Sequence, residues 1–237
     1  MMRLDKYLAE MGAGSRAEVK KQIRWGKVTV DGKTIRKPEY KLDEACAEVS
    51  YKGISIAYQK QEYYMLNKPA GVVSATRDSK EKTVLDLIES KKRKDLFPVG
   101  RLDKDTEGLL LITNDGELAH RLLSPKKHVD KVYFAKVAGA VTEEDVIRFS
   151  EGIGLDHDEV AKPAGLEILT SGEISEIRLT IQEGKYHQVK RMFQAVGKEV
   201  LYLKRLSMGS LVLDETLEPG QYRPLKEEEL DALCSKE

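Results

Sequence analysis

The sequence predicts an α+β protein in which a small basic N-terminal module precedes a larger domain of mixed strands and helices. Apolar residues recur at helical spacing near the N-terminus, and alternating or continuous apolar runs of strand length follow further along the chain. Strands and helices mixed in this way are typical of α+β domains. The length of 237 residues allows one large domain or a small and a medium one.

The N-terminal module is expected to contain two short helices packed on a small hairpin sheet. Apolar spacing over residues 4–11 predicts the first helix, and the capping box Ser15-Arg16-Ala17-Glu18 predicts the start of the second. Gly26 ends this second helix. The pair Asp31-Gly32, between two short runs of strand-forming residues, is typical of a type I′ hairpin turn.

A polar stretch separates this module from the second domain. We expect the module at residues 1–57, a linker at 58–62 and the larger domain at 63–237. Strands are expected at 63–67, 108–113, 131–137 and 177–181, and helices at 83–90, after the turn at 114–116, and at 189–196.

Composition excludes several classes of protein. No apolar run approaches the roughly 18 residues that a membrane span needs, and the charged start of the chain predicts no secretory signal. The two cysteines, Cys46 and Cys234, lie far apart in the sequence, which excludes a disulfide framework and a cysteine-type zinc site. A reducing cytoplasm is therefore the expected location.

Charge is segregated along the chain although it sums to zero. Residues 1–41 hold eleven basic and five acidic residues, a net charge of +6, whereas residues 214–237 carry −5. A basic module attracts a polyanion such as RNA, because each neutralised phosphate releases counterions. Charge alone is equally consistent with a solvated helix surface. The cations on or beside the second helix are Arg16, Lys20, Lys21, Arg24 and Lys27.

An acidic loop at residues 100–108 precedes the apolar run of the strand at 108–113. Its alternating carboxylates resemble the opening of a calcium-binding EF-hand loop, but the twelfth position from Asp103 is Asn114 instead of glutamate, and the intervening leucines belong in a sheet. The calcium interpretation therefore does not fit. Two interpretations remain, a plain polar connection and a catalytic loop, and residue types alone favour the first.

A basic turn at residues 184–192 leads into an amphipathic helix, an arrangement that suits phosphate. His187 in this turn could act as a general base, but it has no evident carboxylate partner in the sequence.

The four histidines lack close metal-ligand spacing, so no metal is expected. Gly71, after Asn67-Lys68-Pro69-Ala70, lacks the pattern of a phosphate-binding P-loop. By pattern alone, Tyr133 is a strand aromatic. The residue types therefore do not identify a reaction.

Four segments in series resemble the RsuA branch of the pseudouridine synthases. Residues 1–57 resemble an S4 RNA-binding domain, and the other three segments are Leu66–Gly71, Gly100–Leu109 and Gly184–Phe193. This resemblance covers essentially the whole chain. It implies a small S4 (αL-type) domain followed by a catalytic domain on a mixed, mainly antiparallel sheet flanked by helices.

The resemblance also implies roles for individual residues. Asp103 would be the catalytic aspartate, Tyr133 the ring that stacks on the target base, and Lys190 the basic partner of Asp103. Arg101 would help to hold the nucleotide out of the RNA stack. The reaction that the resemblance implies, conversion of a uridine to pseudouridine, needs one positioned carboxylate and neither a metal nor a cofactor. The other expected RNA contacts are Arg3, Arg16, Lys20, Lys21, Arg24, Lys27, Lys185, His187 and Arg191.

Within this branch the sequence most resembles the bacterial small-subunit enzymes. The expected substrate is a uridine of 16S ribosomal RNA, free or in a small-subunit assembly intermediate, and the expected protein is a monomer. Lys190 in 188–192 and the C-terminal segment 220–225 support this target. The alternatives are a sister enzyme that acts on 23S ribosomal RNA and a non-catalytic S4-containing assembly protein. A glycosidase is less favoured, because Asp103 and Asp105 show no sign of separate acid and nucleophile environments.

Overall fold

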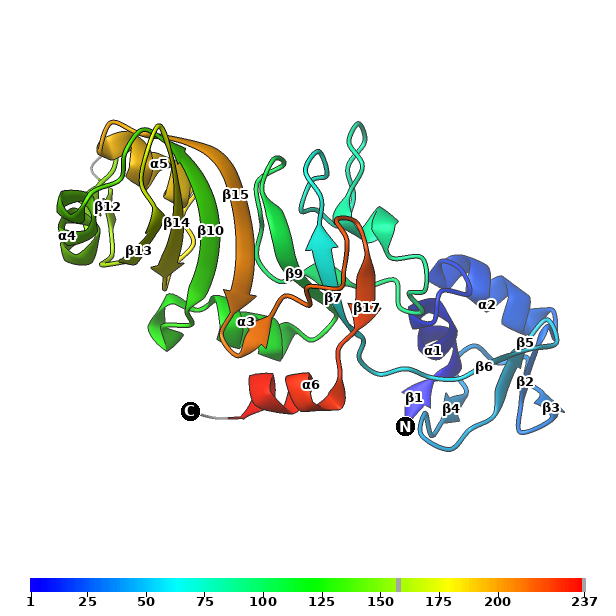
Figure 1. Ribbon diagram of the computed structural model, residues 1–237. Coiled ribbons are helices and arrows are strands. Elements are labelled where there is room, and N and C mark those ends of the chain that lie inside the picture. Colours follow the sequence, from blue (N-terminus) through cyan, green and yellow to red (C-terminus); the bar gives the residue numbers. More distant parts are fainter. Residues whose placement is uncertain (157–158, 236–237) are drawn as a thin grey trace. The chain divides into compact units, whose positions relative to one another are not determined.

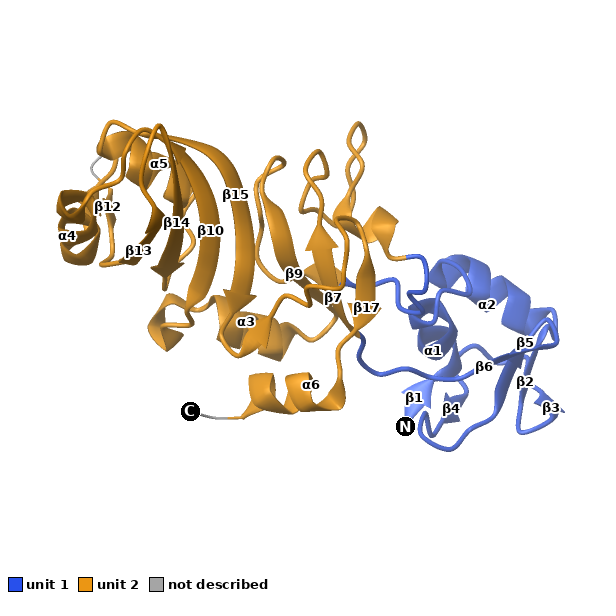
Figure 2. Ribbon diagram, in the orientation of Figure 1, with its two compact units in different colours: residues 1–62, 89–96 blue, residues 63–88, 97–237 orange. Residues whose placement is uncertain are grey.

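The computed structural model describes residues 1–156 and 159–235, so His157 lies outside the described residues (Figure 1). The chain forms two compact units, coloured separately in Figure 2. Unit 1 comprises Met1–Glu62 together with Glu89–Leu96, and unit 2 comprises Tyr63–Ile88 and Phe97–Glu237. Residues 89–96 therefore return to the N-terminal unit, although the sequence analysis assigned them to the larger domain.

Unit 1 contains the two expected helices and the hairpin. Its helices are α1 (Leu4–Glu10) and α2 (Arg16–Arg24), and its strands are β1 (Met2–Arg3), β2 (Val28–Val30), β3 (Lys33–Thr34), β4 (Lys41–Leu42), β5 (Val49–Tyr51) and β6 (Ile54–Ile56). A four-stranded sheet has the order β3-β2-β5-β6, and β1 pairs with β4.

Local sequence explains the boundaries of these elements. The Ser15 hydroxyl accepts a hydrogen bond from the Glu18 N–H, and the Glu18 carboxylate accepts one from the Ser15 N–H, which closes the predicted capping box. Asp31 and Gly32 have φ values of 49° and 75°, as a type I′ turn requires. The apolar sides of the helices and sheet meet in one core that includes Leu4, Tyr7, Leu8, Val19, Ile23, Val28 and Val49.

Unit 2 is built on one large sheet. The strands of this large sheet are β7 (Tyr63–Lys68), β8 (Phe97–Pro98), β9 (Glu107–Thr113), β10 (Lys131–Ala138), β13 (Gly165–Thr170), β14 (Ile174–Ile181), β15 (Glu199–Met208), β16 (Leu211–Val212) and β17 (Tyr222–Pro224). Two further strands, β11 (Ile153–Gly154) and β12 (Val160–Ala161), pair with each other in a separate small sheet. The helices of unit 2 are α3 (Gly116–Leu123), α4 (Glu143–Glu151), α5 (Gln188–Ala195) and α6 (Glu227–Cys234), with the 3₁₀ turns η1 (Val84–Leu87) and η2 (Pro125–Lys127).

The sheet is mixed and mainly antiparallel, as expected. Its main order is β13-β14-β10-β15-β9-β7-β17, with β16 beside β15 and β8 beside β9. The pairing of β9 with β15 is parallel, whereas the other pairings in this sheet are antiparallel. In β9 the side chains of residues 109–112 are fully buried, in agreement with the continuous apolar run.

The junction of β9 and β15 depends on a glycine. Gly108 pairs with Arg205 and has a φ of 98°. A Cβ at this position would lie 2.3 Å from the carbonyl oxygen of Arg205. The close approach therefore requires glycine, and it fixes the start of β9 directly after the acidic loop.

One expected helix is shorter than the sequence predicts. Residues 83–90 form only the 3₁₀ turn η1, which Thr83 and Asp86 cap. The chain then leaves unit 2, since residues 89–96 pack with unit 1. Among the described residues, no helix is long and apolar enough to cross a membrane.

Candidate active site

The acidic loop is held by the turn that follows β7. The Ser74 hydroxyl donates to the Leu102 carbonyl at 2.8 Å and accepts from the Leu102 N–H at 3.1 Å. The Gly71 N–H donates to the Lys104 carbonyl at 2.7 Å. These contacts join two of the motifs on which the family resemblance rests, and they fix the backbone on both sides of Asp103.

Lys68 lies beneath the same loop and is fully buried at the end of β7. Its ammonium donates to the carbonyl oxygens of Pro69, Lys104 and Thr106 at 3.0, 3.2 and 2.8 Å. Burial lowers the pKa of Lys68 to about 8, against the opposing effect of the acidic residues of the loop. The sequence analysis missed this anchor. Its signal is a lysine at the end of a strand of otherwise buried residues.

Asp103 is the point at which the acidic loop meets helix α5. The side chain is 23% exposed, and its Oδ2 lies 3.4 Å from the Nζ of Lys190. Its Oδ1 lies 3.6 Å from the Nε2 of His187. The structure therefore gives this carboxylate two basic neighbours from one helix terminus.

Lys190 is shared between two carboxylates. Its Nζ donates to the two carboxylate oxygens of Asp105 at 2.6 and 2.8 Å, which are shorter distances than the one to Asp103. Burial opposes the charge of Lys190, but these bonds and the two nearby carboxylates raise its pKa, so the cation is stable at neutral pH. The hydrogen bond from Lys190 also lowers the pKa of Asp105. Sequence reasoning paired Lys190 with Asp103 alone and gave Asp105 no role.

His187 immediately precedes α5, with a left-handed backbone at φ 47°. Its ring stacks on Tyr186 at a centroid distance of 3.8 Å, and the Tyr186 side chain is exposed. The sequence analysis found no carboxylate partner for His187, and the structure corrects that view, since Asp103 is close to it. The partner comes from a loop more than eighty residues earlier, which local spacing cannot reveal.

The other cations of this turn are engaged by unit 2. Arg191 forms ion pairs with Asp156 and Glu159, and its side chain is only 14% exposed. Lys185 donates to the carbonyl oxygen of Val160 at 2.7 Å. These contacts favour a fastening role for Arg191 over the phosphate contact expected from the sequence.

The side chains of Tyr133 and Arg101 have no polar partner in the described part of the chain. Tyr133 lies on β10, is 7% exposed and is opposite Leu179 and Arg205 in the sheet register. Its hydroxyl forms no hydrogen bond within residues 1–156 and 159–235, and neither does the exposed side chain of Arg101. The structure thus brings Asp103, His187 and Lys190 together, and within the described residues none of the three forms a hydrogen bond or an ion pair with Tyr133.

The predicted RNA contacts of unit 1 divide into two groups. Arg3 binds the buried carboxylate of Asp5 through two hydrogen bonds of 3.0 and 2.9 Å, and Lys20 lies 3.8 Å from the same group. These two cations compensate a buried charge. Within the described part of the chain, the remaining cations form no ion pair and are exposed; they are Arg16, Lys21, Arg24 and Lys27.

Among the described residues, no group of three histidine, cysteine, aspartate or glutamate side chains is arranged to hold a metal ion. Both cysteines are free thiols at exposed positions.

Comparison with known proteins gives consistent matches over the whole chain. Residues 62–195 match the family model described as RNA pseudouridylate synthase, and residues 2–48 match the S4 domain. An uncharacterized RNA pseudouridine synthase of Bacillus subtilis, YtzG, is 51% identical, with 98% of each chain covered. The ribosomal small subunit pseudouridine synthase A of Salmonella typhimurium is 44% identical, with 97% of this chain and 98% of that protein covered.

A solved structure agrees with these relatives. The crystal structure of a pseudouridylate synthase matches with a TM-score of 0.69 and 38% identity, and the match covers 98% of this chain and all of that one. The resemblance to the RsuA branch is thereby confirmed. The chain belongs to the RNA pseudouridylate synthase family, carries an S4 domain in its N-terminal unit, and is an RNA pseudouridine synthase.

Proposed function

We propose that this pseudouridine synthase isomerises a uridine of 16S ribosomal RNA during small-subunit maturation, with Asp103 as its catalytic aspartate. The observation that carries the assignment is the position of Asp103 on an anchored loop, 3.4 Å from Lys190 and 3.6 Å from His187. The small-subunit target is supported by the names of the relatives that are 43–44% identical.

The chemistry requires one ionised carboxylate in a fixed position. The N1–C1′ bond of uridine breaks, the uracil turns, and a C5–C1′ bond forms; C5 then loses its hydrogen as a proton, and N1 gains a proton. Asp103 either attacks C1′ or removes a proton from the sugar, and both routes use its negative charge. The Lys190 ammonium beside Asp103 stabilises that charge.

Other residues hold the RNA. Tyr133 stacks on the uracil, an interaction of about 1–3 kcal/mol that tolerates rotation of the base. Arg101 helps to keep the nucleotide flipped out of its stack. Arg16, Lys21, Arg24 and Lys27 bind phosphates, and Lys185 and His187 line the path of the strand. The protein acts as a monomer in the cytoplasm, on free ribosomal RNA or on an assembly intermediate.

Tritium release from RNA labelled at uracil C5 tests this proposal. The wild type should release tritium from 16S RNA or partly assembled small subunits and not from 23S RNA. Asp103→Asn should lower release at least about 10³-fold and keep its RNA affinity within a few-fold, because the amide cannot act as nucleophile or base. Asp105→Asn, two residues away, is the matched control and should keep measurable turnover.

Each alternative has its own result in this experiment. Release from 23S RNA alone would identify the sister-enzyme specificity. Near wild-type release by Asp103→Asn would show that a different residue performs the chemistry. Mapping the new pseudouridine in the 16S product would identify the target nucleotide.

A further inference from the structure

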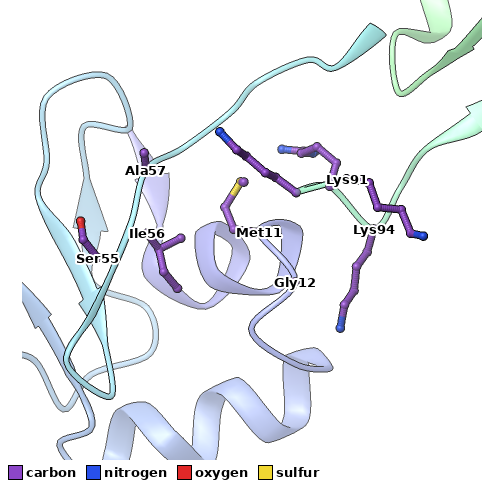
Figure 3. Close-up of a pocket in the computed structure, with 9 residues that line it drawn as sticks. Met11, Gly12, Ser55, Ile56, Ala57, Lys91 and Lys94 are labelled. Carbon is purple, nitrogen blue, oxygen red and sulfur yellow. The ribbon is translucent and has the colours of Figure 1, made fainter. Parts of the chain in front are cut away.

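Unit 1 contains a pocket that the proposed reaction does not use. Its volume is about 520 Å³, and its lining residues are Met11, Gly12, Ser55, Ile56, Ala57, Lys91, Lys92, Arg93 and Lys94 (Figure 3). They come from the end of α1, from β6 and the residue after it, and from the returning segment 89–96. The pocket therefore exists only because this segment packs with unit 1.

The returning segment is fixed by one inward-facing arginine. Arg93 is 4% exposed, and its guanidinium donates to Asp95, Glu10, Tyr58 and the Gln59 carbonyl at 2.8 to 3.2 Å. The backbone is held as well. The N–H groups of residues 92 and 93 donate to the buried Glu62 carboxylate at 2.9 to 3.2 Å.

Because Arg93 points inward, the neighbouring lysines of this segment face solvent. Lys92 and Lys94 are exposed, and neither forms an ion pair with any residue that the structure describes. Lys94 passes close to Gly12, where a Cβ would lie 3.4 Å from the Cε of the lysine. Hydrogen bonds from Ser15, with smaller contributions from Lys94 and Lys21, lower the pKa of Glu18. Lys94 therefore lies beside the start of α2 and extends the basic surface of that helix.

The floor of the pocket is apolar where its rim is basic. Met11, Ile56 and Ala57 provide an aliphatic surface, and Figure 3 shows Met11 directed into the space between β6 and the lysine segment. A nucleotide matches this pairing, since its base and sugar have apolar faces and its phosphates carry the charge.

We propose that this pocket binds one unpaired nucleotide of the RNA strand, with its flanking phosphates on Lys92 and Lys94. The proposal rests on the proposed function in that the RNA substrate supplies the nucleotide. The pocket is a binding subsite of unit 1, separate from the Asp103 site of unit 2. It extends the RNA contacts beyond the S4 match at residues 2–48 to a segment some forty residues later in the chain.

The double variant Lys92→Gln/Lys94→Gln tests the phosphate contacts. In the full-length protein its affinity for 16S RNA should fall about tenfold near 0.15 M salt, and the salt slope of log K should become shallower by about 1.4–1.8. The kcat at saturating RNA should be unchanged while KM rises. Lys33→Gln/Lys37→Gln is the matched control, because it removes the same charge from exposed positions of unit 1 outside the pocket.

Crosslinking tests the nucleotide itself. With 4-thiouridine-substituted 16S RNA, irradiated complexes should yield crosslinked peptides that contain Met11 or residues 91–94. Equal salt slopes in the two double variants, or crosslinks confined to other peptides, would overturn the pocket proposal. Absence of tritium release by a wild type that does crosslink in the pocket would instead contradict the proposed function and leave the pocket in place.

Discussion

Lys68 combines full burial with three carbonyl partners, from Pro69 and from Lys104 and Thr106 of the acidic loop. Its pKa of about 8 lies below the usual 10.5, so between these pH values the unfolded chain holds a proton that the folded protein has lost. Folding stability therefore rises with pH across this window. Below pH 8 the folded protein bears the full cost of a buried ammonium.

Substituting Lys68 with methionine should remove this dependence. We expect the stability of the wild type relative to Lys68→Met to increase between pH 8 and 10.5, by at most about 3 kcal/mol. Urea unfolding at pH 7.5, 8.5 and 9.5 measures the difference. Lys126→Met, at an exposed lysine, should show no such pH-dependent difference in stability from the wild type. A constant difference for Lys68→Met would contradict the assigned pKa.

Gly108 is a second residue with a specific structural role, because its position leaves no room for a Cβ. An alanine here would place its Cβ 2.3 Å from a backbone oxygen at a positive φ. Gly108→Ala should therefore destabilise the protein by about 2–4 kcal/mol and lower kcat, since the displaced strand carries the acidic loop. Gly116→Ala is the control because, apart from its chain neighbours and its own helix backbone, no atom of the described residues lies within 4 Å of a Cβ added there. Equal thermal unfolding midpoints for the two variants would show that β9 can move away without cost.

At the scale of elements, three cations of α2, Arg16, Lys21 and Arg24, form no ion pair with a described residue, and neither does Lys27, which follows the helix. Trp25, the single tryptophan of the chain, follows this helix and is 63% exposed. RNA bound on this surface should change the fluorescence of Trp25. Substitution of Arg16, Lys21, Arg24 and Lys27 by glutamine should make the salt slope shallower by about 3 and abolish the fluorescence change at RNA concentrations that saturate the wild type. An unaltered titration would place the RNA on another face of unit 1.

The elements also show how far local patterns predict structure. The capping box, the Asp31-Gly32 turn and the apolar run of β9 were predicted correctly, because each depends on neighbours in the sequence. The parallel contact of β9 with β15 was not predicted, since it joins residues almost a hundred positions apart. The same limit applies to the site. Motifs placed Asp103 and Lys190 among the candidates, but only the fold shows that Lys190 binds Asp105 more closely.

At the scale of the whole molecule, a net charge of zero hides an uneven distribution of charge along the chain. Unit 1 carries exposed cations that form no ion pair with a described residue, among them Arg16, Lys21, Lys92 and Lys94, whereas Arg191 of unit 2 is held by carboxylates. The overall pI of about 6.9 would not predict RNA binding, because it averages these surfaces with an acidic C-terminal segment.

The return of residues 89–96 to unit 1 bears on how such a protein can be recombined. A chimaera that exchanged only residues 1–62 would transplant an incomplete domain. Moved to another protein, residues 1–62 would lack Arg93 and its lysines. In this chain, replacement of residues 1–62 would leave Arg93 without its partners Glu10 and Tyr58. The transferable RNA-binding unit of this chain therefore consists of two separate stretches, and a graft that preserves its packing must carry both.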